Sequence, residues 1–229
     1  GQQGYYFRQT TDLDCSQINT WPEIVFYGHY DGNGHSISHN KNLYLFVYLA
    51  TNSSLTNLHL QHVGLAKTAN NTHLSAISSS WTLLQCAHRC TLVYCSSDAP
   101  LIEDKANHCT ISDCVVRLDL AGSMLFNPHD EHYGGIAKTI SDSCIVERCL
   151  VTGHAQYQGA GFFHVAGIAN ICTNSTIRQC VLGPFDISSN DVRLYRIASH
   201  FKEDGSVTLS HNAAVDSNTY YWDDKSSQH

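Results

Sequence analysis

The chain has 229 residues, of which 42% are hydrophobic and 14% are charged, a balance that excludes a disordered chain and suits one strand-rich body. Its net charge of −7, from 13 Lys and Arg against 20 Asp and Glu, argues against nucleic acid as a partner, because phosphate binding needs a basic face. No apolar run approaches the roughly 20 residues of a membrane helix, so we expect no membrane-spanning segment.

The first part of the chain predicts a strand and then a tight corner. Residues 5–14 alternate weakly between apolar and polar types, which predicts a first strand leading into Trp21-Pro22. Asp31-Gly-Asn-Gly34 follows, and it is a strong turn signal because Asn and Gly tolerate positive φ. We expect this segment to join two strands.

The remainder of the chain is organised as a repeat. Two near-copies, residues 135–151 and 167–182, both begin Gly-Ile-Ala and both end with a cysteine followed by two aliphatic residues. Self-similarity of this kind predicts stacked units that bury a continuous core between neighbours. When the cysteine is used as an anchor, the position can be followed without gaps through Leu58, Cys95, Cys114, Cys149, Cys180 and Asn212.

The anchor spacing predicts the fold. The intervals are 37, 19, 35, 31 and 32 residues, so the shortest defines the minimal turn and the longer units carry extra residues. A turn of about 19 residues is too short for a strand-helix-strand unit but accommodates three short strands and three corners. We therefore predict an all-β fold, a right-handed parallel β-helix, with inserted loops at about 61–85, 119–134 and 153–166.

Each unit also predicts its own corner. The anchor and the residue two positions later lie on one face of a strand and should point inward. An apolar residue also lies three positions before the anchor, and this odd step breaks strand alternation. We therefore expect corners at the polar pairs in between, which are Ser112-Asp113, Glu147-Arg148 and Arg178-Gln179.

We expect one β-helix domain over residues 1–229. Residues 1–44 would form the N-terminal cap and first turn, 45–215 the repeat turns, and 216–229 a C-terminal tail. Both ends are rich in aromatic residues, and we interpret these as caps over the exposed core, although exposed aromatic side chains also suit sugar or protein contact. They are Tyr5, Tyr6, Phe7, Trp21, Phe26, Tyr27 and Tyr30 at the start and Tyr220, Tyr221 and Trp222 at the end.

Ten cysteines are many for this length, and several recur at the same place in successive units. Pairing into disulfides stays open. The interpretation that we favour is a stack of reduced thiols that serve as small core hydrophobes.

Two segments resemble a known family. Phe26-x-Gly-x-Tyr-Asp-Gly-Asn-Gly-His-Ser-Ile-Ser38 resembles the opening segment of GLUG-type repeat proteins, and residues 134–153 resemble the GLUG repeat itself. The resemblance covers residues 5–215 and implies a pectin-lyase-like β-helix of bacterial adhesins, virulence proteins or non-catalytic parts of secreted peptidases. It implies a secreted or cell-surface location. Such surface proteins usually contain few cysteines, so delivery into a reducing host cytosol is the alternative.

Groups that could carry catalysis are scattered. Polysaccharide-cleaving enzymes on this fold need grouped carboxylates, and no acidic pair recurs at a matching place in adjacent units. We therefore interpret these pairs as exposed loop carboxylates. The sequence also has no Gly-x-Ser-x-Gly elbow and no phosphate loop. The acidic pairs are Asp12/Asp14, Glu103/Asp104, Asp130/Glu131, Glu203/Asp204 and Asp223/Asp224.

One group of residues raises a metal hypothesis. Cys86, His88 and Cys90 would lie on one face of a strand, and all three are good zinc ligands. The same face would equally be the interior of the solenoid, where they would simply pack. No fourth ligand is evident, so we expect no metal and no other cofactor.

Recognition is the function that the sequence favours. Solenoids usually bind through inserted loops, which here supply the candidate binding residues His129, Asp130, Glu131, His132, Tyr133 and Tyr157. We expect a non-enzymatic binding or scaffold module that recognises a glycan or a host protein. Two alternatives stay open: a polysaccharide lyase or glycoside hydrolase on the same fold, and an accessory region of a larger secreted peptidase, which would make the chain part of a longer polypeptide.

Overall fold

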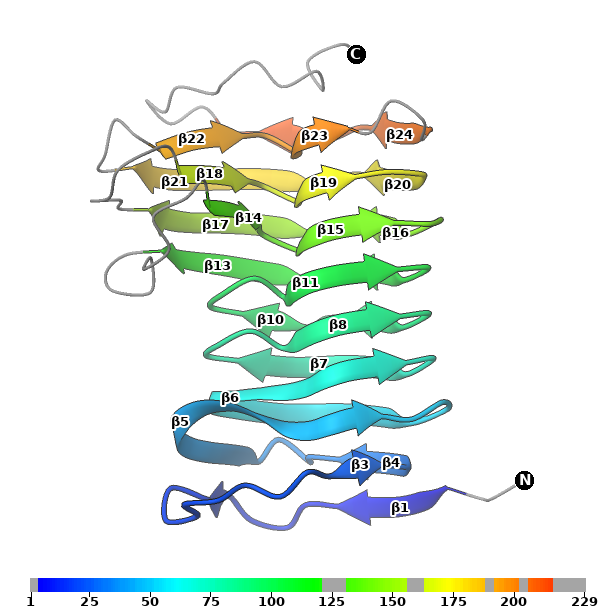
Figure 1. The fold of residues 1–229 in the computed structure, drawn as a ribbon, viewed down its shortest axis with the longest axis vertical. Coiled ribbons are helices and arrows are strands. Elements are labelled where there is room, and N and C mark those ends of the chain that lie inside the picture. The colour runs from blue at the N-terminus through cyan, green and yellow to red at the C-terminus, as the bar shows by residue number, and fades with distance from the viewer. Residues whose placement is uncertain (1–3, 121–130, 156–162, 188–191, 202–205, 216–229) are drawn as a thin grey trace.

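A computed structural model describes residues 4–120, 131–155, 163–187, 192–201 and 206–215. These residues form strands and no helix, and successive turns stack into the parallel β-helix that the repeat predicts (Figure 1). Within the described part of the chain there is accordingly no helix long and apolar enough to span a membrane.

Each turn passes through three faces, which we call face 1, face 2 and face 3 in the order that the chain visits them. Face 1 stacks β3 (Val25–Phe26), the end of β5 (Ser36–Leu49), the end of β6 (Ser54–Asn70), β8 (Leu84–His88), β11 (Ile102–Asn107), β15 (Ala137–Ser141), β19 (Ala169–Cys172) and β23 (Ala198–Phe201). Face 2 stacks β1 (Tyr5–Arg8), β4 (Gly28–Asp31), the start of β6, the start of β7 (His73–Ser79), β9 (Thr91–Val93), β12 (Thr110–Ser112), β16 (Ile145–Glu147), β20 (Ser175–Arg178) and β24 (Val207–Ser210). Face 3 stacks β2 (Leu13–Asp14), the start of β5, the middle of β6, the end of β7, β10 (Ser96–Ser97), β13 (Val115–Leu120), β17 (Leu150–Ala155), β21 (Val181–Ile187) and β25 (Ala213–Ala214).

A separate small sheet stands beside the three faces. It consists of β14 (Glu131–Gly134), β18 (Phe163–Ala166) and β22 (Val192–Tyr195), which pair in parallel. Each of these strands lies on the connection from face 3 to face 1, so the small sheet occupies the third corner of the later turns.

Residues with positive φ make the other two corners. The corner between faces 1 and 2, corner 1, has one such residue on most turns, at Asn52, Asn71, Arg89, His108 and Asn174, and two between β15 and β16, at Asp142 and Ser143. The corner between faces 2 and 3, corner 2, has one at Asn33, Asn57, Ala76, Tyr94, Asp113, Arg148, Gln179 and His211. The three predicted corner pairs are confirmed, because each contains a corner 2 residue. The Asp31-Gly-Asn-Gly34 turn is also confirmed and joins β4 to β5.

The structure corrects one interval of the repeat. Strand register places Ile77 between Leu58 and the position of Cys95, so the interval of 37 residues holds two short turns. The predicted loop at 61–85 is therefore wrong, because β6, β7 and β8 occupy it as regular strands. The extra turn was not predicted because it has no cysteine anchor and because an alanine, Ala76, takes the corner position that Asn57 has on the preceding turn. The later intervals do carry extra residues, most of them at the third corner. One extra residue lies at the corner between β15 and β16, and another forms a bulge in β21.

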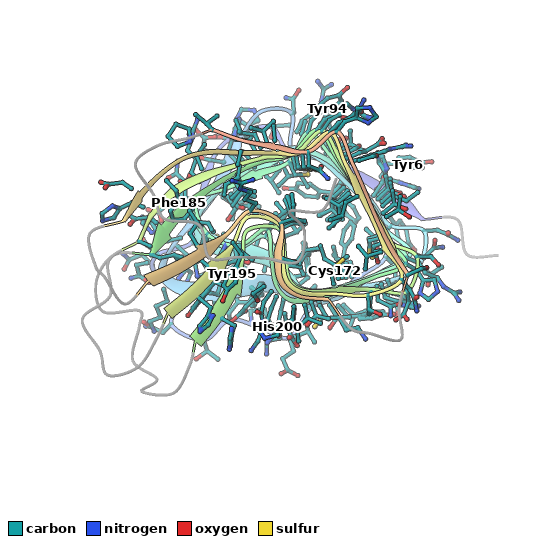
Figure 2. All side chains as sticks on the ribbon, turned by 90° about the horizontal axis from the view of Figure 1, so that it is seen from above. Tyr6, Tyr94, Cys172, Phe185, Tyr195 and His200 are labelled. Atoms are coloured by element: carbon teal, nitrogen blue, oxygen red, sulfur yellow. The ribbon has the colours of Figure 1, made fainter. Side chains whose placement is uncertain are left out.

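Both corners are lined inside by columns of small or aliphatic side chains. Corner 1 has Ser53, Thr72, Cys90, Cys109, Cys144 and Ser175, and corner 2 has Leu58, Ile77, Cys95, Cys114, Cys149 and Cys180, all of them buried. All ten cysteines are free thiols. Figure 2, which looks down the helix axis, places Cys172 of face 1 in the interior as well.

The thiols in these columns contact the same kind of hydrogen-bond partner, a nearby backbone carbonyl oxygen. The Sγ atoms of Cys109 and Cys114 lie 3.2 Å from the carbonyl oxygens of Asn107 and Ser112, each two residues earlier. Ser175 Oγ contacts Thr173 in the same way at 2.8 Å. The carbonyl oxygen of Asn107 also accepts the backbone N–H of Arg89, the corner residue of the preceding turn, at 2.9 Å. The small donor inside the corner therefore supplies a second hydrogen bond to the same oxygen.

The N-terminal aromatic residues cap the core only in part. Phe26 is buried, and Trp21 packs on the core and donates its indole N–H to Leu45 O at 2.9 Å. Tyr5 and Tyr6 are 75% and 82% exposed and Tyr27 is 60% exposed, so the expectation that they cover the core is wrong. They lie on or near an edge of the solenoid, and Figure 2 shows Tyr6 pointing outward. The aromatic residues at 220–222 lie outside the described residues.

Candidate recognition surface

The small sheet brings together histidine and tyrosine side chains from successive turns. Strand register aligns His132 with His164, and Ala166 with Tyr195. Each small-sheet strand leads through a short connection into a strand of face 1. In the first of these turns a Cβ at Gly134 would collide with the carbonyl oxygen of Ala137, so this turn requires glycine. Ala166 and Tyr195 occupy the same register position on the next two turns.

The rings form one contiguous cluster, which we call the histidine–tyrosine cluster: His132, His164, Tyr195 and His200. The His132 and His164 ring centroids are 4.4 Å apart, and His200 meets His132 edge-on at 5.7 Å. The Tyr195 ring stacks on His164 at 5.8 Å, and its hydroxyl lies 3.1 Å from His164 Nδ1. Figure 2 shows Tyr195 where the small sheet meets face 1, with His200 on the outside of face 1.

The cluster suits recognition of a polar surface. Imidazole and phenol groups can each donate or accept a hydrogen bond, and their rings supply apolar contact area at a low cost in side-chain entropy. His132 and His164 are half-buried, so their orientation is held by the fold. Among the described residues, no group of three or more His, Cys, Asp or Glu side chains has the geometry to hold a metal ion.

The predicted binding residues fall partly in this cluster. His132 belongs to it, and Tyr133 packs against the core beside it. The backbone of Glu131 opens β14 opposite Phe163, while His129, Asp130 and Tyr157 lie outside the described residues. His164, Tyr195 and His200 were not predicted from the sequence. His164 could have been found, because it precedes Gly167-Ile-Ala by the same number of residues as His132 precedes Gly135-Ile-Ala.

The structure separates the three residues of the metal hypothesis. Cys86 and His88 lie on β8 and are half-buried, whereas Cys90 is buried beyond the corner at Arg89. His88 Nδ1 is 2.9 Å from Asn107 Oδ1, and Cys90 Sγ contacts the carbonyl oxygen of His88 at 3.3 Å. The corner turns Cys90 into the core while the other two side chains remain on the outside.

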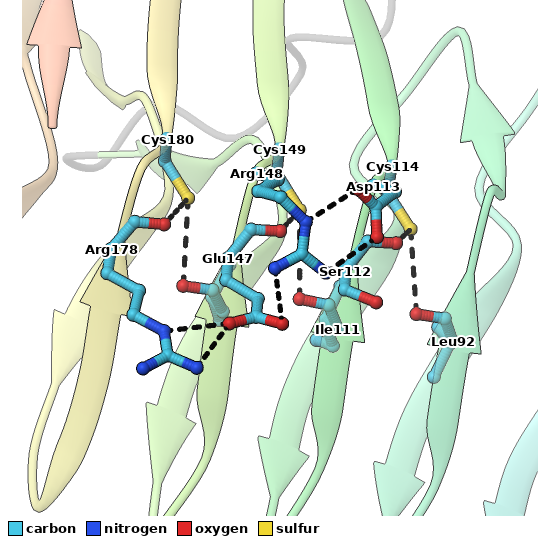
Figure 3. A network of polar contacts seen from close by, with 11 residues as sticks. Leu92, Ile111, Ser112, Asp113, Cys114, Glu147, Arg148, Cys149, Arg178 and Cys180 are labelled. Atoms are coloured by element: carbon cyan, nitrogen blue, oxygen red, sulfur yellow. Dashed lines mark hydrogen bonds and ion pairs between the residues drawn. The ribbon is translucent and has the colours of Figure 1, made fainter. Parts of the chain in front are cut away.

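Carboxylates from adjacent turns do meet on the outside of corner 2 (Figure 3). Arg148 links Asp113 on the preceding turn to its own neighbour Glu147, and Arg178 of the next turn reaches Glu147 at 2.6 Å. We call these four residues the corner ion ladder. Hydrogen bonds from the arginines hold the pKa of Asp113 and the pKa of Glu147 below their ordinary values, and the carboxylates raise the pKa of Arg148.

This electrostatic arrangement is unsuited to acid–base catalysis. A general acid or base works best with a pKa near the working pH, whereas here the carboxylates are held ionised and the arginines are held protonated. Opposite charges on three successive turns instead neutralise one another at this corner. We interpret the corner ion ladder as a set of ion pairs that stabilises the stacking of adjacent turns.

Comparison with known proteins gives a likeness in fold. No model of a known protein family matches the sequence, and no curated protein matches it. Among solved structures, the fold is similar to that of a Bacteroides ovatus protein described as a "putative immunoglobulin A1 protease", with a TM-score of 0.52 and 14% identity, covering 93% of this chain and 78% of that one. The GLUG-type resemblance thus stays a prediction. At this identity, the likeness establishes the β-helical architecture alone.

Proposed function

We propose that this chain is a non-enzymatic binding and scaffold region of a bacterial secreted, surface or host-delivered virulence protein, and that the histidine–tyrosine cluster contacts a host protein. The observation that carries the proposal is the small sheet. It is built from extra residues at one corner of three successive turns, whereas the earlier turns close that corner with a few residues. Insertions on one side of a solenoid are where recognition usually lies.

The chemistry of the cluster supports a protein partner. Aromatic side chains with a polar end are enriched in protein interfaces, where they bury area and keep a hydrogen bond. His164 is such a residue, and its contact with the hydroxyl of the buried Tyr195 at 3.1 Å fixes its ring before binding. Binding to a preformed surface costs less conformational entropy.

The structural neighbour favours a more specific context. We propose that the chain serves as an accessory region of a larger secreted peptidase, with hydrolysis carried out elsewhere in that protein. The description of the Bacteroides ovatus structure as a protease supports this. The corner ion ladder also supports a non-catalytic role, because the carboxylates that meet across turns are neutralised by arginines.

Binding and cleavage can be measured on the same samples. The chain would be immobilised and exposed to immunoglobulin A1, immunoglobulin G and a panel of other secreted host proteins, followed by gel analysis of each protein for cleavage. We expect selective binding without cleavage. Tyr195→Ala and His164→Ala should each weaken binding about 10-fold, which corresponds to about 1.4 kcal/mol.

The matched control is His211→Ala, an exposed corner residue that should leave binding unchanged. Circular dichroism would verify that every variant keeps its fold. Cleavage of a bound protein, or of a polysaccharide, by the isolated chain would contradict the non-enzymatic role. Binding that ignores both cluster variants would show that another surface makes the contact.

A further inference from the structure

A second surface lies on the early turns, away from the small sheet. The Tyr44 ring crosses Gly64, its register partner on the next turn, so closely that a Cβ there would lie 2.6 Å from the Tyr44 Cδ1 atom. Trp81 packs beside it, with the ring centroids 5.1 Å apart and the planes inclined by 41°. Both rings are half-buried. The glycine therefore makes room for an aromatic pair that the fold holds in place.

Glu103 reaches this pair, and Asp104 follows it on the same strand, because β11 contains a bulge. Face 1 strands usually bury residues three positions apart, as in Ala66 and Ala69, but β11 buries Ile102 and Ala106. The register shifts between Ile102 and Lys105 against both neighbouring strands. The extra residue leaves Glu103 and Asp104 exposed. Bulges commonly redirect side chains at functional sites.

The bulge connects to the aromatic pair by a hydrogen bond. The Tyr44 hydroxyl donates to Glu103 Oε2 at 2.7 Å, although the two residues are 59 positions apart. Burial and the nearby carboxylate raise the pKa of the Tyr44 phenol, so it remains a donor at neutral pH. Among the described residues, neither Glu103 nor Asp104 has a cation within ion-pair distance, so both keep acceptor capacity for a ligand.

We propose that Tyr44, Trp81, Glu103 and Asp104 form a binding site for a neutral carbohydrate. The aromatic pair offers apolar surface to the C–H face of a sugar ring. The carboxylates accept hydrogen bonds from sugar hydroxyls, and such charge-assisted bonds are the stronger kind. The indole N–H of Trp81 has no partner among the described residues and can donate to a sugar oxygen. This site goes beyond the proposed function and does not rest on it.

The surrounding charge favours a neutral ligand over a cationic one. Aromatic rings beside carboxylates also suit an ammonium group. Here, however, Lys105 directly follows the bulge, and Lys138 lies opposite the bulge on β15, between the register pairs Ile102–Ala137 and Lys105–Thr139. Both lysines are exposed and offset the charge of Glu103 and Asp104. A cationic ligand would therefore gain little electrostatic binding energy at this site. An acidic sugar would be repelled by the carboxylates of Glu103 and Asp104.

Isothermal titration of the 229-residue chain would test this site. The probes are neutral oligosaccharides, namely the tetramers of N-acetylglucosamine, mannose, galactose and xylose, with tetralysine as the cationic probe. We expect at least one neutral tetramer to bind. Trp81→Ala should weaken that binding about 10-fold, because one ring–sugar contact of about 1.4 kcal/mol is lost. Tyr44→Phe keeps the ring and should weaken binding less.

Three further variants separate the outcomes. Glu103→Gln keeps the shape and one acceptor, so sugar binding should fall only a few fold, whereas tetralysine binding, if it occurred, would be lost. Tyr94→Ala, at an aromatic residue that is 67% exposed on corner 2, should change nothing. Absence of binding to every neutral tetramer, binding that survives Trp81→Ala, or binding of tetralysine alone would each overturn the proposal. His164→Ala should leave sugar binding intact, so the two surfaces are tested independently.

Discussion

Arg148 donates two parallel hydrogen bonds to Asp113 on the preceding turn, from Nε to Oδ1 and from Nη2 to Oδ2, each 2.8 Å long. Its remaining terminal nitrogen, Nη1, lies 2.7 Å from Glu147. The planar guanidinium group therefore joins two carboxylates of different turns through its fixed geometry. Because both carboxylates sit where the chain bends into corner 2, this contact ties the corners of adjacent turns together.

The first prediction concerns the shape of that contact. Arg148→Lys keeps the charge but cannot form the paired hydrogen bonds, so we expect a lower melting temperature. The decrease should be small, because exposed ion pairs are weak, and about 0.5 M NaCl should remove most of it by screening. Arg89→Lys is the matched control: Arg89 has the same left-handed conformation at corner 1 and no ion pair among the described residues. An equal decrease in both variants would contradict the prediction.

The second prediction concerns acid. The arginines hold the pKa of Asp113 and the pKa of Glu147 below their ordinary values of 3.8 and 4.5. A lowered pKa in the folded state stabilises the protein fully above the ordinary value, and that stabilisation is lost as the pH falls through the folded-state pKa. Thermal unfolding measured between neutral pH and about pH 3 should show a steeper acid loss for the parent chain than for Arg148→Met. If the melting temperatures of the two proteins fell in parallel as the pH was lowered, the corner ion ladder would make no contribution to acid stability.

The sequence predicted the regular part of the fold because that part is local. Cys114, Cys149 and Cys180 recur with the same neighbours, and each is preceded by a polar residue that takes the left-handed corner conformation. Periodicity therefore located the corners and the inward positions. The turn centred on Ile77 was missed because it has neither a cysteine anchor nor a polar corner residue: Ala76 stands where Asn57 does on the preceding turn.

The candidate surfaces were harder to predict because non-local pairing creates them. His132, His164 and His200 come from three turns, and their proximity depends on the register of strands that lie tens of residues apart. The contact of Tyr44 with Glu103 spans 59 residues and depends on the bulge in β11. A single sequence shows the acidic pair but not which aromatic side chain crosses two turns to meet it.

The third prediction tests the role of the thiols at the corners. Cys109 donates to the carbonyl oxygen of Asn107, and serine or threonine occupies the same column on other turns. Cys109→Ser should therefore cost little stability, because the hydroxyl keeps this bond. Cys172→Ser should cost about 1–3 kcal/mol, because a hydroxyl buried without a partner is penalised. Cys172 is buried on face 1, and no such bond is present there among the described residues. Urea unfolding of both variants would measure the two losses of stability. Equal losses would contradict the hydrogen-bonding role of the corner thiols.

The fourth prediction concerns the backbone of corner 2. Ala76 is exposed and has a φ of 52°, a conformation that costs an ordinary L-residue roughly 1–2 kcal/mol and that asparagine adopts more readily. Asparagine already occupies this place on the preceding turn, at Asn57. Ala76→Asn should therefore raise the free energy of unfolding by about 0.5–1 kcal/mol. Ser75→Asn, on the adjoining strand residue, should give no such gain. A loss of stability in Ala76→Asn would show that the interior packing around Ile77, and not the corner conformation, limits the stability of this turn.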